Sequence, residues 1–188
     1  MISAEFSLPS GHLGATYFSL GESLEAQGKV DDAIRAYQQA LQVTPDLGVA
    51  YGALGRLLRE QGQKEAAIAH YKKAIDQDPQ QWQLYQQLAL TFWDLGQRGE
   101  AVKAYRKALA IAPDHPPLQH QLGVVQEQQG KFKEACACYH QAITLNPHYA
   151  PAYNHLGCTL AKLNKFDQAI AALQKAITLR PQKASYYN

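Results

Sequence analysis

The sequence predicts an all-α solenoid built from antiparallel helix pairs, and three observations indicate this fold class. Prolines recur at a spacing of 34 residues along the 188-residue chain, at Pro45, Pro79, Pro113, Pro147 and Pro181. An amphipathic segment that ends in proline is repeated with few changes, as in DDAIRAYQQALQVTP and KEACACYHQAITLNP. Between the prolines, residues of one type recur in register. Self-similarity at a fixed period of about 20–50 residues is typical of a repeat architecture.

Aligning the chain on these prolines produces columns of leucine, turn residues and tyrosine. The leucine column is Leu20, Leu54, Leu88, Leu122 and Leu156. The turn column is Gly28, Gly62, Gly96, Gly130 and Asn164. The tyrosine column is Tyr37, Tyr71, Tyr105 and Tyr139, with Leu173 in the fifth place. The columns divide the chain into a leader, 1–13, and five units, 14–47, 48–81, 82–115, 116–149 and 150–183.

Each unit is predicted to form two helices. In the second unit, Tyr51, Leu54 and Leu58 recur at helical spacing and give the first helix one apolar face. Gly62 ends that helix, because glycine adopts the left-handed C-cap conformation without strain. The second helix carries Tyr71 and ends before a proline, which disfavours helical geometry in the preceding residue. One helix pair cannot bury its apolar face alone, so at least three units must stack.

The last residues, 184–188, begin a sixth copy of the pattern. Tyr187 lies 34 residues after Tyr153 and falls in the same aromatic column. We expect a truncated sixth unit of a longer protein, and the alternative is a short natural helix that closes the fifth unit. A solenoid edge without a polar cap exposes apolar surface, so a homodimer through the C-terminal edge is also expected.

The columns resemble the tetratricopeptide repeat, a helix-turn-helix unit of 34 residues. The resemblance covers residues 14–181 and recurs five times in phase. It implies a right-handed superhelix whose concave face is lined by the first helix of each pair. The fourth unit departs most from the pattern: Gln119 replaces an aromatic residue, Gln126 replaces an apolar one, and Pro116 and Pro117 open its first helix. We expect a weakened helix there.

No catalytic motif is found in the sequence. GxGxxG, GxxxxGK[ST], HExxH and GxSxG are all absent, and the turn glycines recur singly in four of the five units rather than grouped in a loop. His120 and His155 occupy neighbouring first-helix positions with Cys158 at i+3 from His155, which raises zinc or copper binding as an alternative. Because the chain has no CxxC or HxxxH pair, we expect no metal, no cofactor and no enzymatic activity.

Charge and cysteine usage limit the partners and the compartment. A net charge of +2 predicts no nucleic-acid partner. No apolar run approaches the length of a membrane span, so membrane insertion is not expected. The N-terminus lacks the basic and apolar regions of a secretory signal. Three cysteines form no disulfide framework, which favours a reducing, cytoplasmic location.

The resemblance also implies which residues line the concave face. This face is mixed in charge and rich in amides, which both donate and accept hydrogen bonds. Trp93 stands in a mostly polar column, so it either anchors a ligand or packs on the next repeat. The candidate peptide contacts are Glu22, Arg56, Arg59, Gln83, Gln86, Gln87, Trp93, His120, Gln121, Asn154 and His155.

The sequence therefore predicts a non-catalytic protein-interaction module that binds a peptide segment in the groove of a tetratricopeptide superhelix. The alternative is a recognition or oligomerisation arm of a larger enzyme, such as a glycosyl-, sulfo- or methyltransferase. Its catalytic domain would lie beyond the C-terminus, by analogy with the bacterial arrays that this chain resembles.

Overall fold

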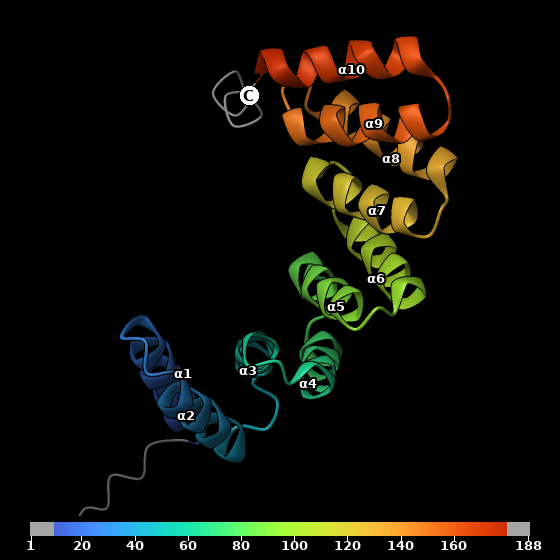
Figure 1. Ribbon diagram of the computed structural model, residues 1–188. Helices are drawn as coiled ribbons and strands as arrows, with labels where there is room; N and C mark the ends of the chain where they lie inside the picture. Colours follow the sequence, from blue (N-terminus) through green and yellow to red (C-terminus); the bar gives the residue numbers. More distant parts are fainter. Residues whose placement is uncertain (1–9, 180–188) are drawn as a thin grey trace, which may run out of the picture. The chain divides into compact units, whose positions relative to one another are not determined.

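A computed structural model describes residues 10–179, and the secondary structure in this range consists of ten helices and no strand (Figure 1). This result confirms the all-α class and the two helices of each repeat. The tail expected to begin a sixth unit lies outside the described residues. The helices are α1 (Ser10–Ala26), α2 (Val30–Val43), α3 (Gly48–Glu60), α4 (Lys64–Gln77), α5 (Trp82–Asp94), α6 (Arg98–Ile111), α7 (Pro116–Gln128), α8 (Phe132–Leu145), α9 (Ala150–Lys162) and α10 (Phe166–Leu179).

The chain divides into two compact units, Met1–Thr91 and Phe92–Asn188. In the first unit α1 packs on α2, α3 packs on α4, and α2 also contacts α3 (Figure 1). In the second unit α7 packs on α8 and α9 packs on α10, while α8 contacts α9 and α6 contacts α7. Each unit therefore alternates contacts within a helix pair with contacts between successive pairs, as a repeat architecture requires.

Within a helix pair such as α7 and α8, a tyrosine of the second helix packs closely against a glycine of the first. Tyr139 of α8 is fully buried against α7. A Cβ atom on Gly123 would lie 2.5 Å from Cε1 of the Tyr139 ring, and one on Gly55 would lie 2.8 Å from Cε1 of Tyr71. Glycine in the first helix thus makes room for the ring that the second helix contributes. In the fifth pair Leu173 takes the place of the ring.

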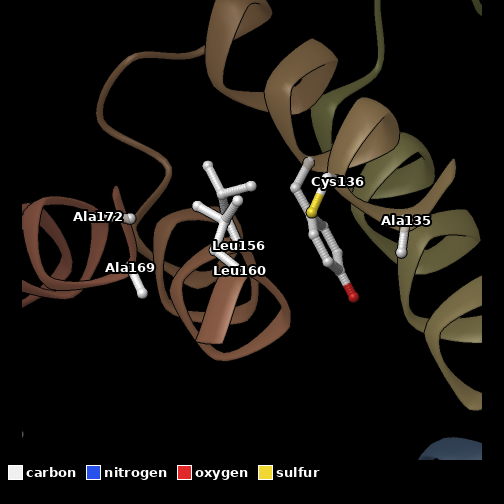
Figure 2. Packing of buried hydrophobic residues seen from close by; sticks show 7 residues of the cluster. Ala135, Cys136, Leu156, Leu160, Ala169 and Ala172 are labelled. Carbon is white, nitrogen blue, oxygen red and sulfur yellow. The ribbon is translucent and has the colours of Figure 1, made fainter. Parts of the chain in front are cut away.

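Contacts between pairs form the second layer of the core. In the second unit, one buried cluster joins α8, α9 and α10. Figure 2 shows Leu156 and Leu160 of α9 between Cys136 of α8 on one side and Ala169 and Ala172 of α10 on the other. In this unit Leu156, a member of the leucine column, is therefore covered by α8 on one side and by α10 on the other.

The turn column behaves as the sequence predicts. Its four glycines all have positive φ, and Asn164, in the same column, has a φ of 59°. Left-handed backbone costs most residues roughly 1–2 kcal/mol, and asparagine tolerates it better than other side chains. The turn that joins the two helices of a pair therefore keeps one backbone conformation in all five repeats.

In the fourth repeat, local contacts accommodate the residues that depart from the repeat pattern, and its first helix keeps its full length. Helix α7 has 13 residues, as many as α3 and α9. His115 caps it by accepting a hydrogen bond at Nδ1 from the Leu118 N–H at 3.3 Å, and prolines suit the first helical positions because they need no N–H partner there. Gln126 is buried, and its Oε1 accepts a hydrogen bond from Cys138 Sγ at 3.1 Å. Burial raises the pKa of the Cys138 thiol to about 11, so the thiol keeps its proton.

We expect Cys138→Ala to lower the free energy of unfolding by about 1–2 kcal/mol, because it leaves the buried Gln126 oxygen without a donor. The double change Gln126→Leu with Cys138→Ala restores the residue types found at these two columns in the first repeat, Leu24 and Ala36. It should recover most of the loss, as measured by urea unfolding. Equal stability of Cys138→Ala and the parent protein would contradict this account of the pair.

Candidate functional site

Within each compact unit, first helices of successive repeats lie next to one another, because Arg56 of α3 donates to Glu25 of α1 and α7 contacts α9. The surface that these helices offer is called here the first-helix face. In the first unit it belongs to α1, α3 and the start of α5, and in the second to α7 and α9. Glu22 lies on α1, Arg56 and Arg59 on α3, and Gln83, Gln86 and Gln87 on α5. His120 and Gln121 lie on α7, and Asn154 and His155 on α9. The structure brings Glu22 together with Arg56, and His120 together with His155.

Trp93 is half-buried and lies near the C-terminal end of α5. The guanidinium carbon of Arg98, at the start of α6, lies 5.1 Å from the centre of the Trp93 ring. This is a cation–π distance. The indole is therefore partly covered by its own chain.

A pocket of about 360 Å³ opens on the first-helix face between α1 and α3. The second helix of the first pair contributes one tyrosine to its wall, and the other walls come from α1 and α3. The lining residues are Phe18, Glu22, Glu25, Ala26, Tyr37, Gly52, Ala53 and Arg56.

The Glu25 carboxylate organises the polar wall of this pocket. Its Oε2 accepts a hydrogen bond from the Tyr37 hydroxyl at 3.1 Å, and its Oε1 accepts one from Arg56 at 2.5 Å. Arg56 also donates to Glu60 at 3.3 Å. Partial burial lowers the pKa of Arg56, but its bonds and ion pairs with Glu25 and Glu60 raise that pKa overall. Burial, followed by the charge of Glu25, raises the pKa of Tyr37, so the phenol remains a donor.

A similar arrangement occurs in the second unit. Glu127 of α7 accepts hydrogen bonds from the Tyr139 hydroxyl at 2.9 Å and from Lys162 Nζ at 2.7 Å. His155 Nδ1 lies 3.6 Å from the same carboxylate. Burial by itself raises the pKa of Glu127, but the bonds from Lys162 and Tyr139 lower that pKa overall. The carboxylate is therefore charged at neutral pH.

We call these two arrangements the glutamate nodes: Glu25 with Tyr37 and Arg56, and Glu127 with Tyr139 and Lys162. The repeat pattern of the sequence does not predict them. One signal was available, because each glutamate lies 12 residues before its tyrosine and the two pairs share the same columns. The cations come from different columns, so periodicity could not have identified Arg56 and Lys162 as equivalent partners.

The two histidines beside the second node are in ring contact. The ring centroids of His120 and His155 are 4.8 Å apart, and the His120 ring also lies 5.7 Å from Tyr139 and 5.5 Å from Tyr149. His120 Nε2 is buried and has no hydrogen-bond partner. Burial, and then the nearby His155, lowers the pKa of His120 to about 4. His120 is therefore a neutral ring inside an aromatic cluster.

Metal binding and membrane insertion call for other arrangements of residues. Among residues 10–179, no group of three or more His, Cys, Asp or Glu side chains is placed to hold a metal ion. Over the same residues, no helix combines the length and the apolar character needed to cross a membrane.

Comparison with known families identifies the repeat. A family model described as tetratricopeptide repeat matches residues 12–80 and 114–182, and another with the same description matches residues 83–115. The chain belongs to the tetratricopeptide repeat family. This membership supports a role as a protein-interaction module. No curated protein matches this tetratricopeptide repeat chain.

Solved structures resemble the chain over most of its length. A crystal structure of MamA is 25% identical and superposes with a TM-score of 0.84, covering 95% of this chain and 97% of that one. YrrB, described as a tetratricopeptide repeat protein with an unusual peptide-binding site, is 21% identical with a TM-score of 0.77, covering 88% of this chain and 86% of its own. PilF of Pseudomonas aeruginosa is 18% identical with a TM-score of 0.75, covering 90% and 77%. The last two likenesses show the fold alone.

Proposed function

We propose that this tetratricopeptide repeat protein binds an extended peptide segment of a partner protein on its first-helix face. The observation that carries the proposal is the open pocket between α1 and α3, which combines aromatic, small and charged walls. The description of the similar YrrB structure as having a peptide-binding site supports the same use of the fold.

The glutamate nodes make this face suitable for binding. The part-exposed Arg56 side chain is held by two carboxylates, so it is already ordered before a ligand arrives. Ordering a flexible side chain at an interface costs roughly 0.5–1.5 kcal/mol, and a preordered wall avoids part of that cost. Arginine is also enriched among residues that dominate binding energy.

The test uses blocking substitutions and a random dodecapeptide library displayed on phage, selected on the whole chain. Ala53→Trp fills the pocket, and Asn154→Trp adds bulk to an exposed position of α9 on the first-helix face. Matched controls are Ala69→Trp and Gln141→Trp, which change exposed positions on second helices. We expect selected peptides to lose about tenfold or more in affinity with a blocking variant and little with its control. Peptides that respond to neither blocking variant would overturn the proposal.

A second role is favoured by a separate observation on α10. Phe166, Ile170 and Ile177 are 60%, 55% and 54% exposed and lie along one stripe of the helix. In the preceding repeat the same columns hold Phe132, Cys136 and Ile143, and Cys136 and Ile143 pack in the cluster that joins α8 to α9. We propose that the exposed stripe of α10 packs against the same stripe of a second copy.

Sedimentation velocity over a range of concentrations tests this self-association. The parent chain is expected to show a monomer–dimer equilibrium that Ile170→Glu abolishes, because a charge would then be buried at the contact. Gln168→Glu, at an exposed position of α10 away from this stripe, is the matched control and should still dimerise. A parent chain that stays monomeric at every concentration would contradict the dimer.

A further inference from the structure

The pocket between α1 and α3 carries an excess of negative charge. Its lining contains the carboxylates of Glu22 and Glu25 and a single guanidinium, that of Arg56. Glu60 binds the same guanidinium from outside the pocket, so Glu25 and Glu60 together already neutralise Arg56. Glu22 is exposed and makes no hydrogen bond or ion pair within the described residues. One carboxylate is therefore available to a ligand.

Apolar surface lies beside these carboxylates. Phe18 packs against Tyr37 with ring centroids 5.3 Å apart, and Ala26, Gly52 and Ala53 complete the wall. Lysine and arginine place their methylene stems on apolar surface while the charged head reaches a polar partner. An aromatic face within about 6 Å also attracts a cation.

We infer that this pocket receives one lysine or arginine side chain of the bound segment, with its stem on Phe18 and Ala53 and its head between Glu22 and Glu25. This inference rests on the proposed peptide-binding function. An acidic side chain fits the pocket poorly, because both carboxylates repel it and Arg56 already donates to Glu25 and Glu60.

The second unit lacks this preference at the corresponding columns. Three repeats after Glu22 the column holds Val124, and three repeats after Phe18 it holds His120. The carboxylate of Glu127 is bound by Lys162 and lies beside His155. Selection for a basic side chain is therefore a property of the first two repeats and sets the register of the bound segment.

The test begins with the phage-selected peptides whose binding Ala53→Trp weakens. We expect lysine or arginine to be enriched at one position of these peptides. A synthetic peptide carrying lysine there should bind about tenfold more tightly than the same peptide with acetyl-lysine, which keeps the stem and removes the charge. Glu22→Gln should weaken the lysine peptide several-fold and leave the acetyl-lysine peptide unchanged. Glu65→Gln removes an exposed charge from α4 and should leave both peptides unchanged.

The outcomes separate this inference from the function on which it rests. If Ala53→Trp displaces peptides that show no basic enrichment, or lysine and acetyl-lysine bind equally, the inference fails and the peptide-binding function stands. The inference also fails if Glu22→Gln and Glu65→Gln have equal effects. If neither Ala53→Trp nor Asn154→Trp displaces any selected peptide, the proposed function fails and the inference fails with it.

Discussion

Replacing Tyr139 with alanine is expected to lower the free energy of unfolding by about 3–5 kcal/mol, the range seen when a large buried aromatic side chain is removed. The Tyr139 ring is fully buried and joins the cluster that holds Cys136, Leu156 and Leu160. It also lies on Gly123, which has no side chain to fill the space that the ring would leave. Tyr139→Ala therefore removes packing within the α7–α8 pair and packing between α8 and α9 at the same time.

Phenylalanine substitutions separate the ring from the hydroxyl. Tyr139→Phe should cost about 1–2 kcal/mol, because Glu127 loses a donor. Tyr71→Phe should be close to neutral, because the Tyr71 hydroxyl is buried without a hydrogen-bond partner. Tyr71→Ala should nevertheless match Tyr139→Ala. Urea unfolding followed by circular dichroism gives all four values.

Because Tyr71 and Tyr139 occupy the same column, the two phenylalanine variants differ mainly in whether the hydroxyl oxygen that they remove had a hydrogen-bond partner. If Tyr71→Phe destabilised the chain as much as Tyr139→Phe, the hydroxyl of Tyr71 would have an unseen partner and the contrast between the two repeats would be lost. If either alanine variant cost less than about 1 kcal/mol, the tyrosine column would not be the core that its burial indicates.

The fold could be predicted from the sequence because each repeat solves the same packing problem with the same residues. The tyrosine column is repeated because a ring from the second helix must fit against the backbone of the first, as at Gly55 and Gly123. The positive φ at Asn164 was predictable for the same reason, since its column is otherwise glycine.

The candidate site could be predicted only in part, because binding residues differ from repeat to repeat. Of the predicted contacts, the structure brings Glu22 and Arg56 to one pocket and His120 and His155 into ring contact, and their role in binding stays a prediction. The glutamate nodes were not predicted, because each cation reaches its carboxylate from a different column. Ion pairs between long side chains depend on rotamers and neighbours, which a 34-residue period does not encode.

His120 is expected to make the chain less stable as the pH falls from about 6.5 to about 4. Burial is the main cause of the low pKa of this histidine, and the neighbouring His155 of α9 adds to it, while Glu127 acts in the opposite direction. Tyr139 and Tyr149 also lie against the ring. The folded chain therefore holds the ring neutral down to about pH 4.

The sign follows from the two pKa values. In the unfolded chain this imidazole has a pKa of 6.5, and in the folded chain its pKa is about 4. Below pH 6.5 the unfolded state binds a proton that the folded state does not, so protonation favours unfolding. The contribution is fully present above pH 6.5 and is lost as the pH falls to about 4. One pKa unit corresponds to about 1.4 kcal/mol, so the loss for a partly buried ring is about 2–3 kcal/mol.

The experiment is urea unfolding of the parent and of His120→Gln at intervals between pH 7 and pH 4. Glutamine is the residue that this column holds in the third repeat, Gln86, and it does not titrate. The variant should lose about 2–3 kcal/mol less than the parent over this range, whereas His148→Gln, at an exposed position, should follow the parent.

The lower end of the range contains a second titration. The pKa of Glu127 is lowered, so its stabilising contribution is lost only as the pH falls below about 4.5. The interval between pH 6.5 and pH 5 therefore reports on histidine alone, and His70, whose pKa burial also lowers, contributes there with the same sign in the first unit. Parallel curves for the parent and His120→Gln in this interval would mean that His120 is charged in the folded chain. The aromatic cluster beside the second glutamate node would then carry a positive charge that the structure does not assign to it.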